Sequence, residues 1–208
     1  MTSTDTGGHR LFAALYDRLS APVERAVLGP RRAELVGPLT GTVLDVGAGT
    51  GANLPHFRAA ERVVATEPDP AMWRRLTERV RAAAVPVAVG DAGAERLPHP
   101  DGAFDAVVFT LVLCTVGDPA RALAEAYRVL RPGGRLVALE HVRGSGRHAR
   151  LQRRLDPLWT RMMAGCHLDR DTGAAIRAAG FRIEHEERFT VEPSWNPTSS
   201  VLQLTGSR

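Results

Sequence analysis

Residues Thr42–Gly51, TVLDVGAGTG, decide the fold that the sequence predicts. An apolar run here ends directly in three glycines spaced two apart, Gly47, Gly49 and Gly51. Such a run is typical of a buried parallel strand that ends in a tight turn. Glycine also lets a ligand approach the backbone more closely than any Cβ would allow. We therefore expect a cofactor site at this turn, with a helix that starts near Asn53 and presents its N-terminus to the ligand.

Length and composition indicate one globular domain over residues 1–208. The chain is 44% hydrophobic and 24% charged, which is ordinary for an enzyme. No stretch has the roughly 18 apolar residues of a membrane span, and the N-terminus has no signal-peptide pattern. We therefore expect a cytoplasmic protein without stable membrane insertion. The net charge of +4 permits contact with nucleic acid but does not argue for it.

The two cysteines, Cys114 and Cys166, lie far apart in the sequence and lack C-x-x-C spacing. This pattern predicts neither a disulfide framework nor a metal site, so buried reduced thiols are expected.

Strands and helices alternate along the chain, which is typical of a doubly wound α/β fold with a mostly parallel sheet. Residues 1–40 are expected to form a helical cap. Two final strands with no helix between them indicate an antiparallel end to the sheet. The expected helices are Leu11–Leu28 (interrupted by Pro22), Arg31–Val36, Ala71–Ala84, Pro119–Leu130, Arg147–Met163 and Thr172–Ala179. The expected strands are Thr42–Val46, Arg62–Thr66, Val85–Val89, Phe104–Leu113, Arg135–Leu139, Phe181–Val191 and Val201–Thr205, with RPGG (131–134) as a break before the fifth.

Acidic residues close the first three expected strands or lie within them. Asp45 precedes the glycines, Glu67 ends the second strand and Asp91 ends the third. An acid at the position of Glu67 can accept from both ribose hydroxyls of a nucleoside. The glycines taken with Ala52 also satisfy a loose dinucleotide-binding pattern, which leaves a nicotinamide cofactor as an alternative.

The ordered segments VLDVGAGTG, ATEPDP, VGDAGAERLP, FDAVVFTLVLCTV and VLRPGGRLVALEHV make the chain resemble the class I S-adenosylmethionine-dependent methyltransferases. The resemblance implies a seven-stranded Rossmann-like sheet and S-adenosylmethionine as cofactor, with S-adenosylhomocysteine as its product. It places Asp45 at the methionine end, Glu67 at the ribose, Asp91 at the adenine edge and Thr110 under the sulfonium. The cofactor-binding residues that it implies are Tyr16, Asp45, Gly47, Ala48, Gly49, Asn53, Glu67, Pro68, Met72, Asp91, Ala92, Thr110 and Leu111.

The second half of the chain resembles the methyltransferase-like 7 group of thiol S-methyltransferases through TLVLCTV, LEHV, LDPLW, GCHLDRDT and AGF. This resemblance implies a small lipophilic thiol, such as a natural product or xenobiotic, as the acceptor. The apolar N-terminal anchor of the animal members has no counterpart in this sequence, so their membrane association is not expected here.

Methyl transfer to sulfur needs a thiolate, and a free thiol with a pKa of about 8.5 is only slightly ionised at neutral pH. His141, at the carboxyl end of the fifth strand, is expected to take the thiol proton while Glu140 orients its ring. A histidine that merely caps a loop is the alternative. The expected substrate-binding residues are Leu113, Cys114, Trp159, Met163, His167 and Arg170.

Residues 143–170 are expected to form a lid whose apolar helix face covers the substrate pocket. A basic helix on a membrane or on nucleic acid is the alternative. Asp156 is expected to fix a turn before Pro157, and Trp195 to close the far side of the pocket.

Three other functions remain open. The first is O-, N- or C-methylation of a small aromatic or quinone-type metabolite. The second is nucleic-acid methylation, which is disfavoured because the fourth strand ends in TLVLCT and no aromatic stacking platform is visible. The third is a non-catalytic scaffold. A monomer or weak homodimer is expected, and the acceptor's identity and the number of sulfurs methylated are left open.

Overall fold

The computed structural model describes residues 21–208. Its first elements are a π-helical turn, η1 (Glu24–Leu28), and the helix α2 (Gly29–Val36), which follows without a break because the connecting residues are helical. Part of the segment expected to form a helical cap is therefore helical, whereas Tyr16 lies outside the described residues. Leu35 and Val36 bury one face of α2 against the sheet.

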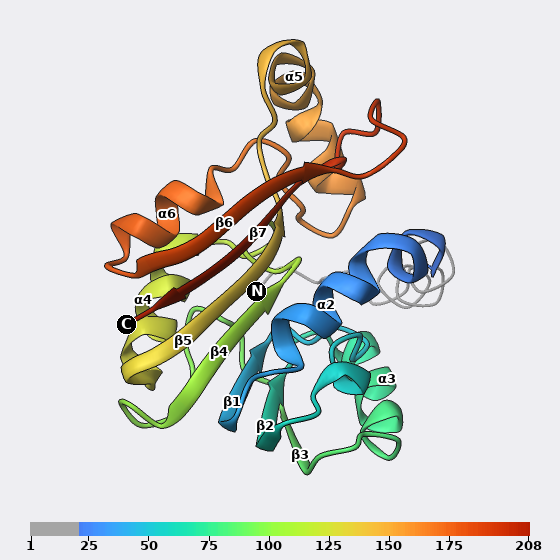
Figure 1. Cartoon of the computed structure of the whole chain (residues 1–208). Coiled ribbons are helices and arrows are strands. Elements are labelled where there is room, and N and C mark those ends of the chain that lie inside the picture. Colours follow the sequence, from blue (N-terminus) through green and yellow to red (C-terminus); the bar gives the residue numbers. More distant parts are fainter. Residues whose placement is uncertain (1–20) are drawn as a thin grey trace, which may run out of the picture.

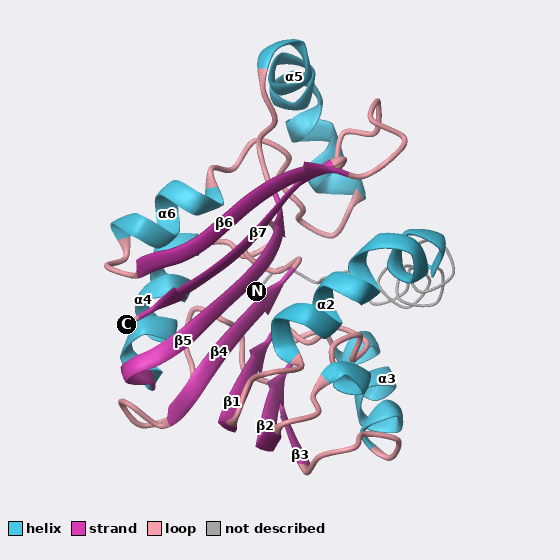
Figure 2. Cartoon of the chain, viewed as in Figure 1, coloured by secondary structure: helices cyan, strands magenta, loops and turns pink. Residues whose placement is uncertain are grey.

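A seven-stranded sheet runs through the molecule in the order β3-β2-β1-β4-β5-β7-β6 (Figures 1 and 2). The first five strands pair in parallel, and β7 pairs antiparallel with both β5 and β6. This confirms the predicted fold class, including the antiparallel end. The strands are β1 (Gly41–Val46), β2 (Ala60–Thr66), β3 (Val87–Gly90), β4 (Phe104–Thr110), β5 (Leu130–His141), β6 (Arg182–Thr190) and β7 (Ser200–Ser207).

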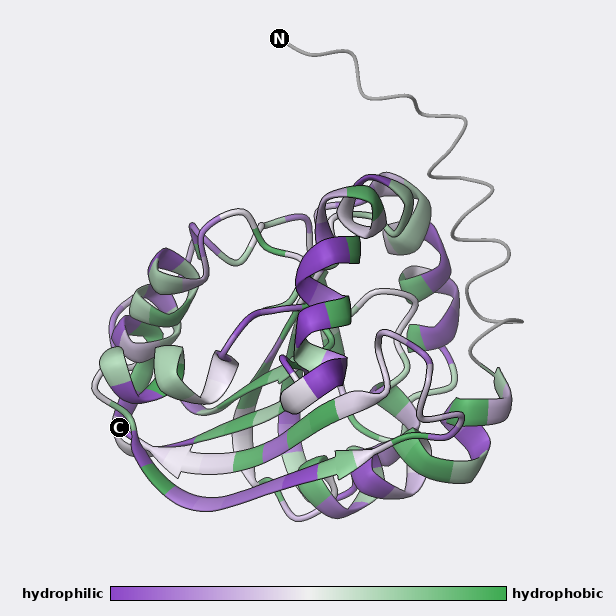
Figure 3. Ribbon diagram, turned by 90° about the horizontal axis from the view of Figure 1, so that it is seen from above, coloured by the Kyte–Doolittle hydropathy of each residue, from purple (hydrophilic) through white to green (hydrophobic). Residues whose placement is uncertain are grey.

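Helices cover both faces of the sheet. α4 (Pro119–Val129) and α6 (Thr172–Ala178) lie on one side, and α2 and α3 (Pro70–Val80) lie on the other (Figure 1). Each layer encloses its own apolar core, around Phe109 and Leu123 on the α4 side and around Phe57 and Leu76 on the α3 side. Figure 3 shows hydrophobic and hydrophilic residues alternating along the helices, as expected for helices that turn one face to the sheet. This arrangement leaves the carboxyl ends of the parallel strands free to form a site.

Several predicted boundaries are wrong, among them the end of the fourth strand, which lies at Thr110 rather than Leu113 because the chain turns at Leu111. The segment after the glycine turn forms only a 3-10 turn, η2 (Leu54–His56), because the Asn53 side chain is drawn into the interior and the chain re-enters the sheet at Ala60. The RPGG segment does not precede β5 but belongs to it, with Leu130 opposite Phe104 and a register shift in the ladder. α3 ends at Val80, four residues earlier than predicted.

Helix α5 (Gly146–Met162) follows β5, as predicted, and lies beyond the carboxyl end of that strand (Figure 1). Pro157 lies inside the helix without ending it, so Asp156 occupies a helical position rather than the expected turn. Part of the predicted apolar face is exposed, since Leu158 is 59% exposed and Met162 is 67% exposed, whereas Leu155 and Trp159 are half-buried. Trp195, which was expected to close the far side of the pocket, is 75% exposed. In residues 21–208, no helix combines the length and apolarity needed to cross a bilayer.

Candidate active site

The turn after β1 brings bare backbone to the carboxyl edge of the sheet. Gly47 has a φ of 62°, and a Cβ there would lie 2.8 Å from the Val112 side chain, so glycine is required. Gly49 has a φ of 58° and nothing within 4 Å of an ideal Cβ position. The side of the turn at Gly49 is therefore open to a ligand.

Asp45, inside β1, is fully buried and belongs to a polar chain that starts on α2. Arg32 Nη1 donates to Asn53 Oδ1 (2.8 Å), and Asn53 Nδ2 donates to Asp45 Oδ1 (2.8 Å) and to Thr110 Oγ1 (2.9 Å). Arg32 is itself paired with Glu24. Burial raises the pKa of Asp45 to about 7. Its second oxygen, Oδ2, is buried and has no hydrogen-bond partner among residues 21–208, so it can accept from a ligand.

Glu67, at the end of β2, holds the glycine turn in place. Its Oε2 accepts from the Gly49 N–H (2.8 Å) and its Oε1 accepts from the Asp69 N–H (2.8 Å). The side chain is largely buried, and burial raises the pKa of Glu67. A carboxylate fixed in this way lies directly beside the open backbone of Gly49.

The other predicted cofactor residues lie around the same edge. Met72 is in the first turn of α3, where its N–H donates to Asp69, and Pro68 is exposed just before that helix. Asp91 and Ala92 follow β3 and line a cavity of about 350 Å³ that continues along the sheet. Ala48 is buried within the glycine turn and donates to Thr66.

The end of β4 carries local backbone strain. Leu111 has a φ of 61°, a left-handed conformation that side-chain-bearing residues rarely adopt, and its N–H donates to Leu139 O. Such strain is common at functional sites. It turns the chain sharply, so that Thr110 faces Asn53 while Val112 and Leu113 continue toward β5.

Glu140 does not orient His141 as the sequence suggested. It is completely buried, and its carboxylate accepts three backbone N–H groups of the loop after β4. Oε1 accepts from Val112 and Leu113 (both 2.9 Å), and Oε2 accepts from Cys114 (3.2 Å). Burial raises the pKa of Glu140. Both oxygens are used in shaping this loop, and in residues 21–208 His141 has Cys166 as its hydrogen-bond partner instead.

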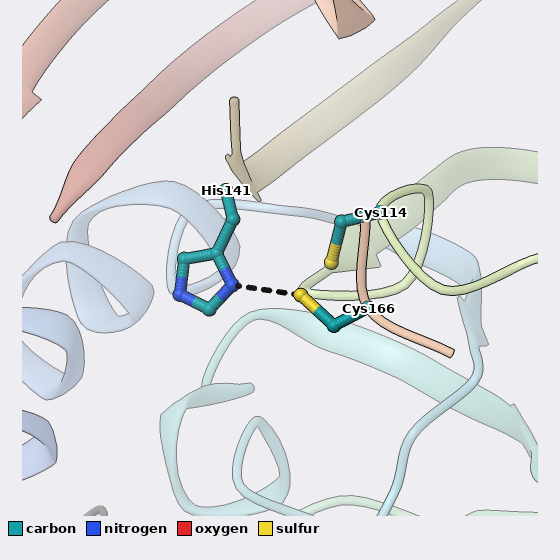
Figure 4. Close-up of side chains that lie close together, drawn as sticks. All are labelled: Cys114, His141 and Cys166. Carbon is teal, nitrogen blue, oxygen red and sulfur yellow. Dashed lines mark hydrogen bonds between the residues drawn. The ribbon is translucent and has the colours of Figure 1, made fainter. Parts of the chain in front are cut away.

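Cys114, His141 and Cys166 come together at this edge, from the loop after β4, the end of β5 and the segment after α5 (Figure 4). Cys166 Sγ lies 3.8 Å from His141 Nδ1. Both cysteines are buried and free, whereas His141 is half-buried. Interactions with Cys114 and His141 lower the pKa of Cys166 to about 5. A hydrogen bond with Cys166 and burial raise the pKa of Cys114.

The remaining predicted substrate residues frame this cluster. The His167 N–H donates to Cys114 O (2.8 Å), and its Nδ1 lies 3.0 Å from Asp156 Oδ2. Arg170 donates to Leu113 O (2.5 Å). These bonds tie the segment after α5 to the loop after β4. Trp159 interacts with Cys166, while Met163, at the end of α5, is 36% exposed.

Sequence reasoning missed three residues of this site. Cys166 lies within GCHLDRDT, one of the segments that indicated a thiol methyltransferase, and this motif was the available signal for it. Arg32 and Glu24 had no such signal, because they reach the site only through the packing of α2 and η1 on the sheet.

Comparisons with known proteins show the family of this chain. A family model described as a methyltransferase domain matches residues 44–138. The chain is 33% identical over 190 residues to human thiol S-methyltransferase TMT1A, covering 88% of this chain and 78% of that protein. It is 40% identical over 101 residues to a demethylmenaquinone methyltransferase from Thermus thermophilus, covering 47% of this chain and 46% of that protein.

Among solved structures, one titled as an S-adenosylmethionine-dependent methyltransferase and possible histamine N-methyltransferase, from Thermotoga maritima, superimposes with a TM-score of 0.69. It is 24% identical to this chain, and the match covers 96% of this chain and 98% of the other. This likeness supports the fold.

Proposed function

The chain belongs to the class I S-adenosylmethionine-dependent methyltransferases, in the group of the thiol S-methyltransferases, and from this premise we propose that it methylates the thiol of a small lipophilic molecule. S-adenosylmethionine supplies a methyl group activated by its sulfonium charge. Everything else that the reaction needs must come from the residues at the carboxyl edge of the sheet.

The glycine turn and its acids fit this cofactor. We propose that Asp45 accepts from the cationic methionine end, because its Oδ2 is buried without a partner in the described part of the chain. The open backbone at Gly49 would accommodate the cofactor without a steric clash, since no atom lies within 4 Å of its Cβ position. Glu67, which already holds Gly49, would accept from the ribose hydroxyls, and Asp91 with Ala92 would contact the adenine.

A thiol acceptor is favoured by the extent of the likeness to TMT1A. That alignment covers 88% of the chain, whereas the alignment to the quinone methyltransferase covers 47%. The longer alignment must include much of the chain outside the matched methyltransferase domain, and Cys166 and Trp159 lie in that part. Methylation of a quinone-type carbon is the second candidate, supported by the higher identity of the shorter alignment.

The site has the physical character that thiolate methylation requires. Attack of a thiolate on a sulfonium removes both charges, so a pocket poor in water favours the reaction. The loop that carries Leu113 and Cys114 is buried, and strain at Leu111 fixes its direction. We propose that His141, the half-buried member of the Cys114–His141–Cys166 cluster, promotes formation of the acceptor's thiolate.

The proposal is tested by incubating the protein with methyl-labelled S-adenosylmethionine and matched pairs of acceptors. Each pair would contain a lipophilic thiol and the alcohol or phenol of the same skeleton. We expect labelled thioethers and unlabelled oxygen analogues. Label in a demethylated quinol or a phenol, with none in any thiol, would overturn the thiol assignment while leaving the family intact.

A further inference from the structure

The side chains of Cys114, His141 and Cys166 offer two sulfurs and one imidazole nitrogen that all lie within 4.8 Å of one another (Figure 4). Thiolate and imidazole are the preferred ligands of zinc(II). We propose that these three residues bind one zinc ion and leave one coordination position open for the sulfur of the acceptor. The second half of this statement rests on the proposed function, whereas the first half does not.

The distances are close to those of a tetrahedral site. Zinc bonds of about 2.3 Å to sulfur and about 2.0–2.1 Å to nitrogen place a sulfur and a nitrogen roughly 3.6 Å apart and two sulfurs roughly 3.8 Å apart. Cys166 Sγ and His141 Nδ1 are already 3.8 Å apart, and no separation in the cluster exceeds 4.8 Å. Side-chain movements of about 1 Å or less complete the geometry.

The backbone holds the three ligands in place without a metal. The Cys114 N–H is bonded to the Glu140 carboxylate, and the Cys114 carbonyl accepts from the N–H of His167, next to Cys166. His141 is fixed by its pairing with Val201 on β7. A site that is already assembled loses less entropy when the ion binds.

The exposure of the ligands indicates where the fourth position lies. Cys114 is 1% exposed and Cys166 is 8% exposed, while His141 is half-buried. Catalytic zinc sites commonly have three protein ligands and one open position, whereas structural sites are closed by four. Among the described residues, the cluster has no fourth ligand, whether histidine, cysteine or acid. The open coordination position therefore lies beside His141, the most exposed of the three ligands.

The helix that precedes Cys166 carries a buried hydrogen-bond donor. The indole Nε1–H of Trp159 is buried and has no hydrogen-bond partner among residues 21–208. Outer donors of this kind orient metal ligands and tune the metal.

Zinc would provide the thiolate that the reaction needs. An acceptor thiol that coordinated the ion would lose its proton to solvent and be held as a thiolate. A lone pair of the acceptor's sulfur would form the new bond to the methyl carbon. The electron pair of the broken bond between that carbon and the sulfonium would stay on the sulfur of S-adenosylhomocysteine. The neutral thioether is a weaker ligand than a thiolate and leaves the ion.

The test is a titration of the reduced, full-length protein with Co²⁺, which absorbs where Zn²⁺ does not. We expect one Co²⁺ per chain and a sulfur-to-cobalt charge-transfer band that one equivalent of Zn²⁺ removes. Cys114→Ser and Cys166→Ser should each lower the band by about half, and His141→Ala should weaken Co²⁺ binding at least tenfold. His185→Ala, an exposed histidine on β6, is the matched control and should change nothing.

Absence of the band in the wild-type protein would overturn the zinc site, and so would an unchanged band in the serine variants. Far-ultraviolet circular dichroism shows whether each variant folds, and the wild-type titration decides the question even if one does not. Co²⁺ bound without a charge-transfer band would indicate Asp156, His167 and Asp169, a neighbouring cluster without sulfur, and would also refute the proposal.

The metal and acceptor proposals fail in distinguishable ways. If Co²⁺ binds through both sulfurs but no thiol is methylated, the metal site stands and the proposed acceptor is wrong. If thiols are methylated at an unchanged rate by protein without metal, coordination of the acceptor by zinc is wrong and the proposed function stands. Adding a small thiol to the Co²⁺ form should strengthen the charge-transfer band, because a third sulfur joins the ion.

Discussion

Replacing Glu140 with glutamine tests whether one buried carboxylate shapes the loop that carries Leu113 and Cys114. In the wild-type protein, Oε1 accepts from Val112 and Leu113, and Oε2 accepts from Cys114. A glutamine can keep one oxygen in place, but its NH₂ group then faces the third N–H, and two donors oppose each other. The loop therefore loses at least one charge-assisted hydrogen bond.

A hydrogen bond to a charged group contributes about 1.5–3 kcal/mol, and an unsatisfied buried N–H costs about 1–3 kcal/mol. Removing a fully buried charge offsets part of this loss, because burial penalises the carboxylate and raises its pKa. We expect a net loss of about 1–3 kcal/mol in the free energy of unfolding, which lowers the melting temperature of a domain of this size by roughly 3–10 °C.

The measurement is urea-induced and thermal unfolding of Glu140→Gln beside Glu184→Gln, an exposed residue on β6. The control should unfold like the wild-type protein. Glu140→Gln should also lose methyl transfer more than affinity for S-adenosylmethionine, because the loop borders the acceptor. Equal stability of the two variants would show that the carboxylate does not hold the loop, and the reasoning would fail.

Further substitutions test the cofactor site and the segment after α5. Glu67→Gln should weaken S-adenosylmethionine binding about 10- to 100-fold, because it loses about 1.5–3 kcal/mol of charge-assisted hydrogen bonding. Calorimetry measures this affinity. The control Glu61→Gln, at an exposed residue near the other end of β2, should bind the cofactor normally. Because burial raises the pKa of Asp45 from 3.8 to about 7, the folded state holds this proton more tightly than the unfolded state. The free energy of unfolding should therefore fall as pH rises through that window, and affinity for the cationic cofactor should rise; Asp45→Asn should flatten both profiles. Asp156→Asn removes the partner of His167 and should raise the KM for the acceptor severalfold without changing cofactor affinity; a change in cofactor affinity alone would contradict this placement.

The sheet and the cofactor edge were predictable because they depend on local patterns. Short apolar runs ending in glycine or acid mark the parallel strands, and Asp45 and Glu67 follow from their places on them. The boundaries of the strands were less predictable. The RPGG segment resembles a break before β5, but Leu130, which precedes it, already pairs with Phe104, so the segment belongs to the strand.

The contacts within the site could not be read from the sequence. Arg32 reaches Asn53 across 21 residues, and Glu140 reaches Val112 across 28, through packing that no local pattern records. The cluster of Cys114 and Cys166 has no metal-binding spacing, because its ligands come from three separate segments and meet only when the segment after α5 folds against the loop after β4.

The most direct test of this account is a competition in one reaction between a lipophilic thiol and a demethylated quinol for a limiting amount of methyl-labelled S-adenosylmethionine. Product mass spectrometry then shows which atom carries the label. The account predicts that the label appears in the thioether and that S-adenosylhomocysteine forms in equal amount. Label confined to the quinol's ring carbon would contradict it.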